Sequence, residues 1–404
     1  MKTYILKRLL LMIPTIVGVT LVTYAIVRLA PGDPIEAMIR NQAGNIDPKA
    51  MKANADRIRE RLGLKEYHHV RDYLFGPLPE GAPKPTGAAY YLAVAADKTA
   101  SIGIGYARWV GHLATGQFGE SIKYRVSKDS VVVTTLDRLR AWLHDTLGVN
   151  WWKQGIDELK ENGSKNPLWL IVDRIPVTLI LNVISETLIF FIAIPIGLAA
   201  ARRQGRWFDR LSSLVILTLW SIPTILAGTL LMGFLGKGGL GVHWFPIAGL
   251  HAFGYEKFAW GRYLADLLWH AVLPVVCLTY GGLAYLAKMG RASLLENLRA
   301  DYVRTARAKG LPEARVVYHH ALRNSLLPMI TVMVLSIPGL IGGSLIVETI
   351  FSIQGTGLLL VGAAQAYDLA LIMTETLLYG VLTLVFLLIG DILYAWADPR
   401  VRYD

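Results

Sequence analysis

The chain has 404 residues, of which 53% are hydrophobic and only 18% are charged, and its formal net charge at pH 7 is +11. Soluble domains carry about 25% charged residues, so this composition argues against a soluble globular protein and for a membrane protein. The positive charge does not indicate nucleic-acid binding, because the basic residues lie mostly beside long apolar segments, where topology and anionic membrane lipid explain them. Cys277 is the only cysteine, which excludes an intrachain disulfide and a multi-cysteine metal site.

Six segments are long and apolar enough to be membrane-spanning helices, because crossing the hydrocarbon layer takes about 20 apolar residues in a helix. In chain order they are residues 9–30, 177–201, 211–236, 270–286, 326–347 and 369–394. The first is expected to be an uncleaved anchor, because its apolar stretch is longer than that of a signal peptide and residues 28–31 make a poor cleavage site. In the fifth, Pro338 and the glycines that follow it indicate close helix packing and a bend. The pattern predicts an all-α polytopic membrane protein with six transmembrane helices.

Lys and Arg in the short flanks of the spans set the orientation in the membrane. They gather on one side, in residues 2–8, 202–210, 288–323 and 400–402, and are scarce in the opposite short loops. Both termini are therefore expected in the cytoplasm. The expected domain organisation is an N-terminal transmembrane helix (1–30), an external subdomain (31–174), a core of five transmembrane helices (175–396) with a cytoplasmic loop (291–327), and a cytoplasmic tail (397–404).

The external segment is expected to be a small folded subdomain and not a disordered tail, because tryptophans such as Trp109 and Trp142 could supply a core. Its residue pattern predicts helices at residues 50–62, 106–113 and 131–147.

The cytoplasmic loop carries the pattern of a helix–turn–helix elbow. Asp301 can cap the start of a first helix, Gly310 suits the left-handed position that ends it, and Pro312 fits the start of the next helix. Thr305, Ala306 and Ala308 keep the tip of the elbow small, which permits the close approach of another protein. The elbow is therefore predicted to be a docking site.

The elbow resembles the coupling loop, the "EAA" loop, of binding-protein-dependent ABC importers. Its Arg-Thr-Ala-Arg-Ala-Lys-Gly stretch (304–310) and the His-Ala-Leu-Arg-Asn-Ser-Leu-Leu-Pro stretch that follows (320–328) are similar to the dipeptide/oligopeptide/nickel branch of that family. Further matching stretches are Pro-Gly-Asp-Pro (31–34), Asp-Arg-Ile-Pro-Val-Thr-Leu (173–179), Glu-Thr-Ile-Phe (348–351), Gly-Thr-Gly (355–357) and Asp-Pro-Arg (398–400). The sequence departs from the family in the loop, where Arg304-Thr305-Ala306 replaces Glu-Ala-Ala, and at Gln354, where the branch often has proline. Residues 77–104 and 127–165 look like insertions.

The resemblance implies the type I ABC importer permease fold, with an enlarged external α-helical insertion after the first helix, in the bacterial inner membrane. It implies a permease subunit that forms half of the translocation path for peptides or similar small solutes. The implied partners are a second homologous permease subunit, two cytoplasmic ATP-binding subunits and an external solute-binding protein. Independently, the sequence contains no G-x-x-x-x-G-K-[ST] phosphate-binding loop, so ATP and Mg are expected to be used by the partner ATPase subunits, with no cofactor bound by this chain.

The residues that the resemblance places in contact with the ATPase lie in the first half of the elbow. The candidates for contact are Tyr302, Arg304, Arg307 and Lys309; the other predicted coupling-loop residues are Ala306 and Gly310, which shape the elbow, and Thr305, which keeps its tip small. For the basic residues the alternative is that they only enforce the membrane topology.

Polar groups inside the spans are the candidates for the translocation path, since ionisable residues in hydrocarbon usually face protein or water. They are Glu186, Ser344, Glu348 and Glu375. A peptide's amino terminus could meet such a carboxylate. The alternative is a hydrogen bond between helices or a solvated rim, which is preferred for Glu348 and for Asp391. His243, His251 and His270 could gather on the outer face, but no metal-ligand spacing accompanies them, so no metal site is predicted.

Two other function classes remain open. A secondary, ion-coupled transporter would need an intramembrane ion or proton site, which Glu186 and Glu375 could supply, and no ATPase. A membrane-embedded enzyme would need a nucleophile with a base or a metal site, and the sequence shows no such constellation.

Overall fold

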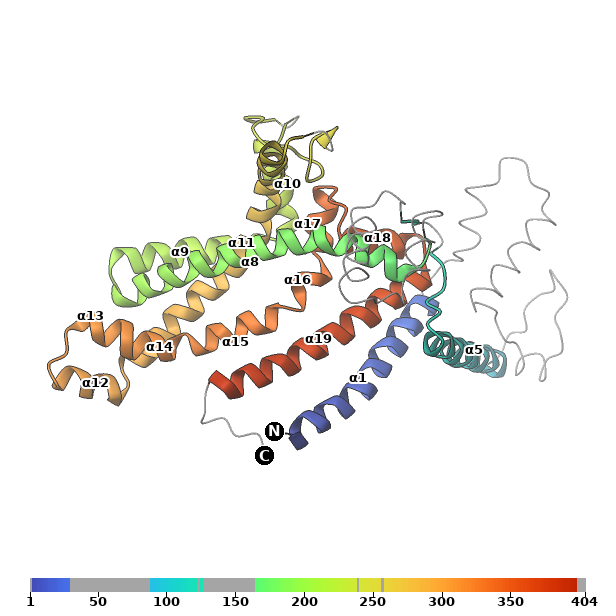
Figure 1. Cartoon of the computed structure of the whole chain (residues 1–404), viewed down its shortest axis with the longest axis horizontal. Helices are drawn as coiled ribbons and strands as arrows, with labels where there is room; N and C mark the ends of the chain where they lie inside the picture. The colour runs from blue at the N-terminus through green and yellow to red at the C-terminus, as the bar shows by residue number, and fades with distance from the viewer. Residues whose placement is uncertain are drawn as a thin grey trace, which may run out of the picture. The chain divides into compact units, whose positions relative to one another are not determined.

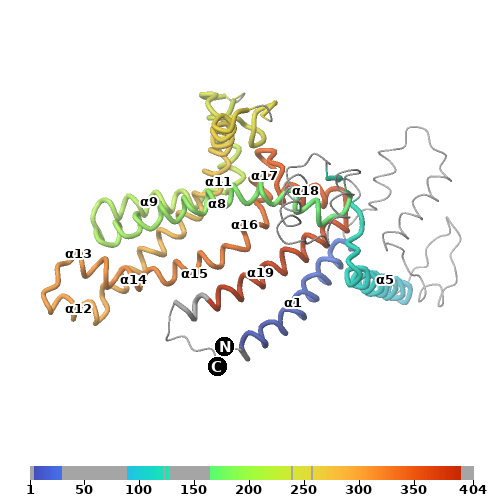
Figure 2. Tube along the Cα trace, in the orientation of Figure 1, coloured from blue at the N-terminus to red at the C-terminus, as the bar shows by residue number. Residues whose placement is uncertain are grey.

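The computed structural model describes residues 2–29, 88–121, 124–126, 164–237, 240–255 and 258–397. Within these residues the chain is helical and contains no strand, only the isolated β-bridges Val126–Ser164 and Gly236–Phe245. Figures 1 and 2 show the helices along the chain. Most of the predicted external subdomain, including the helices expected at residues 50–62 and 131–147, lies outside the described residues.

The chain divides into two compact units. The first unit comprises Met1–Leu9, Arg174–Val361 and Val381–Asp404, and the second comprises Leu10–Asp173 and Gly362–Gly380. The helices are α1 (Lys2–Leu29), α5 (Ala88–Ala114), α8 (Pro167–Arg202), α9 (Trp207–Ser221), α10 (Thr224–Leu235), α11 (Trp260–Leu298), α12 (Asp301–Ala308), α13 (Glu313–Arg315), the π-helical turn η2 (Val316–Ala321), α14 (Leu322–Ser325), α15 (Leu327–Ser336), α16 (Gly339–Gly342), α17 (Leu345–Ile350), α18 (Thr356–Gln365) and α19 (Leu369–Ala397).

Four helices of the described chain, α1, α8, α11 and α19, are long and apolar enough to cross a membrane, and the number rises to six if two bent helix pairs each count as one span. The pairs are α9 with α10 and the stretch Glu313–Ser336 with Gly339–Ile350. These six correspond in order to the six predicted spans. The all-α polytopic architecture predicted from hydropathy is thus confirmed.

The third predicted span, residues 211–236, is not one straight helix. Its two halves, α9 and α10, meet at an angle of 96°. Figure 1 shows α10 leaving the line of α9. The cause is Pro223, which has no N–H to donate and pushes Ile222 before it into an extended conformation (φ −82°, ψ 118°). The fifth span bends by 41° beside Pro338, where the sequence predicts a bend.

Both breaks free backbone carbonyls, and polar side chains from neighbouring helices bond to them. At the first break, the Tyr280 hydroxyl of α11 donates to the carbonyl of Ile222 at 2.7 Å. At the second, the Asn182 amide of α8 donates to the carbonyl of Leu340 at 2.9 Å. An unsatisfied carbonyl is costly in hydrocarbon, so these two side chains stabilise the broken helices.

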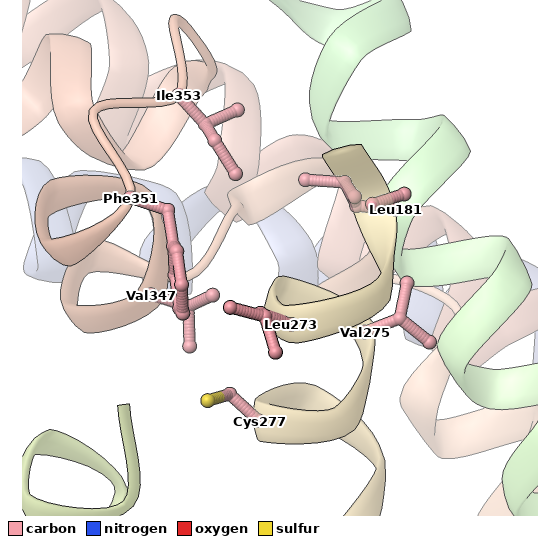
Figure 3. Close-up of a cluster of buried hydrophobic side chains, with 8 residues drawn as sticks. Leu181, Leu273, Val275, Cys277, Val347, Phe351 and Ile353 are labelled. Carbon is pink, nitrogen blue, oxygen red and sulfur yellow. The ribbon is translucent and has the colours of Figure 1, made fainter. Parts of the chain in front are cut away.

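The main core of the first unit joins α8, α11 and α17. Its buried side chains are Leu181, Ala271, Leu273, Val275, Cys277, Val347, Phe351 and Ile353 (Figure 3). Nearer the elbow, α8 and α11 approach closely at Gly197, where an added Cβ would lie 2.7 Å from the carbonyl oxygen of Ala287. Small residues at such crossings let apolar helices pack backbone to backbone.

The second unit has its own aromatic core. Tyr24 of α1 is buried against Met373 of α19, with Tyr106 and Trp109 of α5 beside them. The Thr20 hydroxyl lies 2.8 Å from that of Tyr106. The helix predicted at residues 106–113 is thus the last part of the longer helix α5.

Candidate functional site

The predicted elbow is present at the end of the first unit, where α12 and α13 meet at a tight turn (Figure 1). Gly310 ends α12 with φ +74°, the left-handed conformation predicted for it, and its N–H donates to the carbonyl of Arg307 at 2.9 Å. Pro312 precedes the first residue of α13. One expectation is wrong: Asp301 is the first helical residue and does not cap α12, whose N-cap position is Ala300.

A bidentate ion pair spans the turn of the elbow. Arg307 donates from Nη2 to Oε1 of Glu313 at 2.8 Å and from Nε to Oε2 at 3.1 Å. The bond to Glu313 raises the pKa of the Arg307 guanidinium above its ordinary value. Both side chains are solvent-exposed, so the pair adds little stability, but it fixes the angle between α12 and α13.

The elbow has a buried and an exposed face. Ala306, which is 6% exposed, packs inside the elbow with Val303, Val316 and Ala321 and therefore does not form part of its exposed tip. The exposed residues among the predicted coupling-loop residues are Tyr302, Arg304, Thr305, Arg307, Lys309 and Gly310. These residues form one surface of α12 and the turn after it, which we call the elbow tip.

Side-chain contacts join the elbow to neighbouring helices. The guanidinium of Arg202, at the end of α8, donates to the Tyr318 hydroxyl at 3.1 Å and lies over its ring. Tyr318 belongs to η2, a π-helical turn that no feature of the sequence predicts. Single π-turns inside helices are often found at functional sites, because they redirect side chains without ending the helix.

A second fastening lies at Asp209, in the first turn of α9. Its carboxylate receives two bonds from Arg291 of α11, Nε to Oδ1 at 2.5 Å and Nη2 to Oδ2 at 2.8 Å, and a third from the backbone N–H of Gly205 at 2.9 Å. Asp209 is buried. The pair ties α9 and the turn before it to the part of α11 that leads into the elbow, a link that the positive-inside count of basic residues did not reveal.

Glu348 of α17 is the most enclosed of the predicted path residues, at 2% exposure. Its Oε1 accepts from the Thr178 hydroxyl at 3.0 Å and from the N–H of Ser344 at 3.2 Å, and its Oε2 accepts from the N–H of Leu358 at 2.9 Å. Thr178 in turn accepts from the N–H of Thr356 at 2.9 Å. We call this set the Glu348 junction; it joins α8, α17 and the start of α18.

The Glu348 junction leaves no room for side chains on the glycines around it. A Cβ on Gly355 would lie 2.4 Å from Oγ1 of Thr178 and 2.5 Å from Oε2 of Glu348. Gly343 has φ +73°, and a Cβ there would lie 2.6 Å from the N atom of Gly357. Ser344 caps α17 by accepting from the N–H of Val347. The Glu-Thr-Ile-Phe and Gly-Thr-Gly stretches therefore form one packed structural unit.

The other two path candidates are Glu186 and Glu375. Glu186 of α8 is half-buried, and its Oε1 accepts from the Ser336 hydroxyl of α15 at 2.6 Å. Glu375 of α19 lies in the second unit and is 7% exposed. A role in the translocation path remains a prediction for Glu186, Ser344, Glu348 and Glu375.

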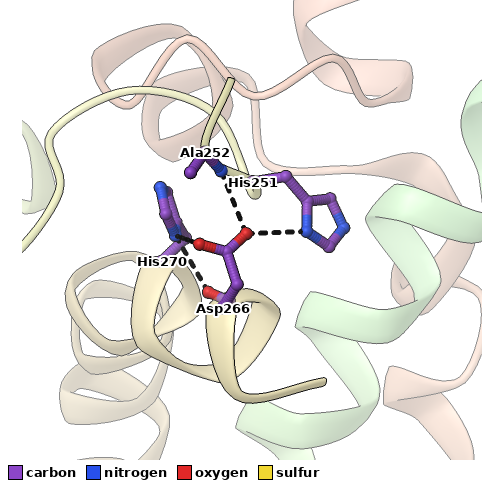
Figure 4. Close-up of polar contacts among 4 residues, drawn as sticks. All are labelled: His251, Ala252, Asp266 and His270. Carbon is purple, nitrogen blue, oxygen red and sulfur yellow. Dashed lines mark hydrogen bonds and ion pairs between the residues drawn. The ribbon is translucent and has the colours of Figure 1, made fainter. Parts of the chain in front are cut away.

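Two of the three histidines expected to gather do so, through Asp266 of α11. Oδ2 of Asp266 lies 3.1 Å from Nδ1 of His251 and accepts from the N–H of Ala252 at 2.9 Å, while Oδ1 lies 3.3 Å from Nδ1 of His270 (Figure 4). His243 is not part of this group. Among the described residues no group of three or more His, Cys, Asp or Glu side chains could hold a metal ion. The cluster fastens the loop between α10 and α11 to α11.

Comparison with known proteins places this architecture in a family. Residues 193–403, which include the elbow and the Glu348 junction, match the family described as "Binding-protein-dependent transport system inner membrane component". Over 403 residues the chain is 31% identical to the oligopeptide transport system permease protein AppB of Bacillus subtilis (strain 168), with 100% of both chains covered.

Two further relatives are named as dipeptide-type permeases. Over 420 residues the chain is 32% identical to the di/tripeptide transport system permease protein DppB of Pseudomonas aeruginosa (strain UCBPP-PA14), with 100% of both chains covered. Over 422 residues it is 31% identical to the dipeptide transport system permease protein DppB of Escherichia coli (strain K12), with 100% of this chain and 99% of the relative covered. The chain therefore belongs to the binding-protein-dependent transport system inner membrane components, the multi-pass permease subunits of ABC importers.

Proposed function

We propose that the chain forms half of the translocation path of an importer for short peptides, and that a second, homologous permease subunit supplies the other half. The named relatives, which are permeases of oligopeptide, di/tripeptide and dipeptide transport systems, support the solute class. Partly satisfied polar groups in the spans, Glu186 above all, are consistent with a path for a polar solute.

The elbow tip is the proposed contact with two cytoplasmic ATP-binding subunits. ATP and Mg are used in those subunits and this chain binds no cofactor itself; the lack of a phosphate-binding loop in the sequence supports this division of labour. Tyr302, Arg304 and Lys309 offer one hydroxyl and two cations to a partner surface. Thr305 and Gly310 keep the approach open, and Arg307 and Ala306 maintain the elbow's shape.

Closure of the ATPases would move the elbow, and the elbow would move the helices to which it is fastened. The Arg202–Tyr318 contact passes the movement to α8, and the Asp209–Arg291 pair passes it to α9 and α11. Rigid helices that rock between two packings convert such a movement into alternating access.

The remaining parts of the proposal concern the two faces of the membrane. Both termini and the elbow face the cytoplasm of a bacterial cell, with membrane lipid around the spans. An external solute-binding protein delivers the peptide to the opposite face. The positive-inside distribution of Lys and Arg supports this orientation.

The single observation that carries the proposal is the exposed elbow tip on an otherwise packed and fastened elbow. Arg304→Glu, which reverses a charge whose side chain is 72% exposed, tests it. In the complete transporter, purified and reconstituted into vesicles, we expect the variant to lose ATPase subunits on purification and to lose ATP-dependent peptide uptake, while membrane insertion stays normal.

Arg206→Glu is the matched control, because Arg206 is an exposed arginine just before α9 and outside the elbow. It should keep both the ATPase subunits and uptake. Wild-type uptake that continues without the ATPase subunits would contradict the proposal and indicate an ion-coupled transporter. Full ATPase binding by Arg304→Glu would contradict the role of the elbow tip.

A further inference from the structure

Glu186 lies near the middle of the second span, where residues 177–201 contain no other charged residue. A carboxylate in that position is costly unless donors surround it or water reaches it. Among the described residues, its one hydrogen-bond partner is the Ser336 hydroxyl, at 2.6 Å from Oε1. Glu348, by comparison, has three donors spread over both of its oxygens. The Glu186 carboxylate can therefore accept further hydrogen bonds.

The Ser336 hydroxyl is itself shared. It lies 2.9 Å from the carbonyl oxygen of Met333, one turn back on α15, as well as 2.6 Å from Glu186. A hydroxyl has one proton to donate, so it can serve only one of these two acceptors at a time. The hydroxyl that bonds Glu186 is therefore not available to this carboxylate alone.

The acceptors gather where the fifth span is broken. Helix α15 ends at Ser336, Pro338 follows without an N–H, and α16 begins at Gly339. The Asn182 amide, one turn before Glu186 on α8, lies 2.9 Å from the carbonyl of Leu340 and 3.4 Å from that of Gly339. Asn182 and Glu186 therefore present one polar face of α8 to the break.

We infer that Glu186 and the broken segment 336–340 form a binding subsite for a primary ammonium group of the transported solute. The inference rests on the proposed function and names the group that is recognised: the α-amino group of a peptide. An ammonium carries three donors, which suit the free carboxylate oxygen of Glu186 and the second lone pairs of the Gly339 and Leu340 carbonyls, whose first acceptor positions Asn182 occupies. Discontinuous helices place backbone carbonyls at cation sites in other transporter folds. The subsite offers chiefly acceptors, so it selects a cation over a carboxylate.

Uptake of two forms of one tripeptide, with a free and with an acetylated amino terminus, tests the subsite in the complete transporter reconstituted with its binding protein. We expect Glu186→Gln to lower the ratio of free-amine to acetylated uptake roughly tenfold, equivalent to about 1.4 kcal/mol, because a neutral amide makes no charge-assisted hydrogen bond to the ammonium group. Glu186→Asp should retain most of the ratio. Glu120→Gln, the same change at an exposed glutamate, should leave it at the wild-type value.

Ser336→Ala distinguishes recognition of the solute by Glu186 from a purely structural role of the hydrogen bond between Glu186 and Ser336. If Glu186 served only to bond Ser336, this variant would reproduce the defect of Glu186→Gln, and the inference would fall. It would also fall if both peptide forms lost uptake equally in Glu186→Gln, or if that variant transported like the wild type.

A labelling experiment tests whether water reaches the subsite, whichever solute the transporter carries. In a Cys277→Ala background, we expect Glu186→Cys in the assembled transporter to react with a cationic, membrane-impermeant thiosulfonate. No reaction would show that water does not reach this position and would overturn the subsite. Absence of wild-type peptide uptake would instead overturn the proposed solute class.

Discussion

At the Glu348 junction, a single carboxylate holds three segments of the chain by accepting hydrogen bonds from each of them. Thr178 contributes a side chain from α8, and Leu358 contributes a backbone N–H from α18. Because the donors surround the carboxylate, they offset part of the cost of its burial, and a side chain on any of the packed glycines would displace it. Stretches that are far apart in sequence, residues 173–179 and 348–357, therefore meet in one local geometry.

Gly355→Ala should destabilise the chain by about 1–3 kcal/mol, since the new methyl group would overlap Thr178 and the carboxylate of Glu348. Thermal unfolding of the purified protein in detergent measures the effect. Gly281→Ala is the control, because a Cβ there meets no atom within 4 Å. Equal melting temperatures for the two variants would contradict the packing described for the junction.

The coupling energy of the Asp209–Arg291 ion pair can also be measured. Asp209→Asn and Arg291→Gln, alone and combined, form a double-mutant cycle. We expect a coupling energy of about 1–2 kcal/mol, less than for a fully buried pair because Arg291 is partly solvated. Additive effects in chemical or thermal unfolding would mean that the pair does not couple α9 to α11.

Some structural features of single helices could be predicted from the sequence, and others could not. Hydropathy predicted six spans because each needs only a long apolar run, but it reports no direction, so it could not predict the 96° break between α9 and α10. Pro223 was the available signal. The turn at Gly310 was predictable from local backbone rules. The contact of Glu348 with Thr178 was not, since its partners are 170 positions apart and only tertiary packing brings them together.

Gly310→Ala should destabilise the elbow by about 1 kcal/mol, because its left-handed backbone strains a residue with a Cβ although the space is open. Gly205→Ala is a matched control with φ +73° and equally open space, in the turn between α8 and α9. Melting temperatures should fall by similar amounts. Only Gly310→Ala should reduce recovery of the ATPase subunits; equal losses in both variants would show a general effect of stability.

For the whole molecule, the positive-inside distribution of Lys and Arg predicts the orientation in the membrane. Phe253, fully exposed in the loop between α10 and α11, and Ala308, exposed on the elbow, are predicted to face opposite sides. In a Cys277→Ala background, Phe253→Cys should react with an impermeant maleimide in cells whose outer permeability barrier has been opened. Ala308→Cys should react only after the inner membrane is disrupted. The reverse pattern would invert the proposed topology.

The first and last helices meet at one end of the first unit. Asp391 of α19 accepts from the Tyr4 hydroxyl of α1 at 2.8 Å and lies 2.6 Å from Nη2 of Arg8. Tyr4 and Asp391 are 387 positions apart, so nearly the whole chain is synthesised before this contact can form. Until then α1 is without this neighbour, and chains that stop short of α19 leave Arg8 and Tyr4 without that carboxylate.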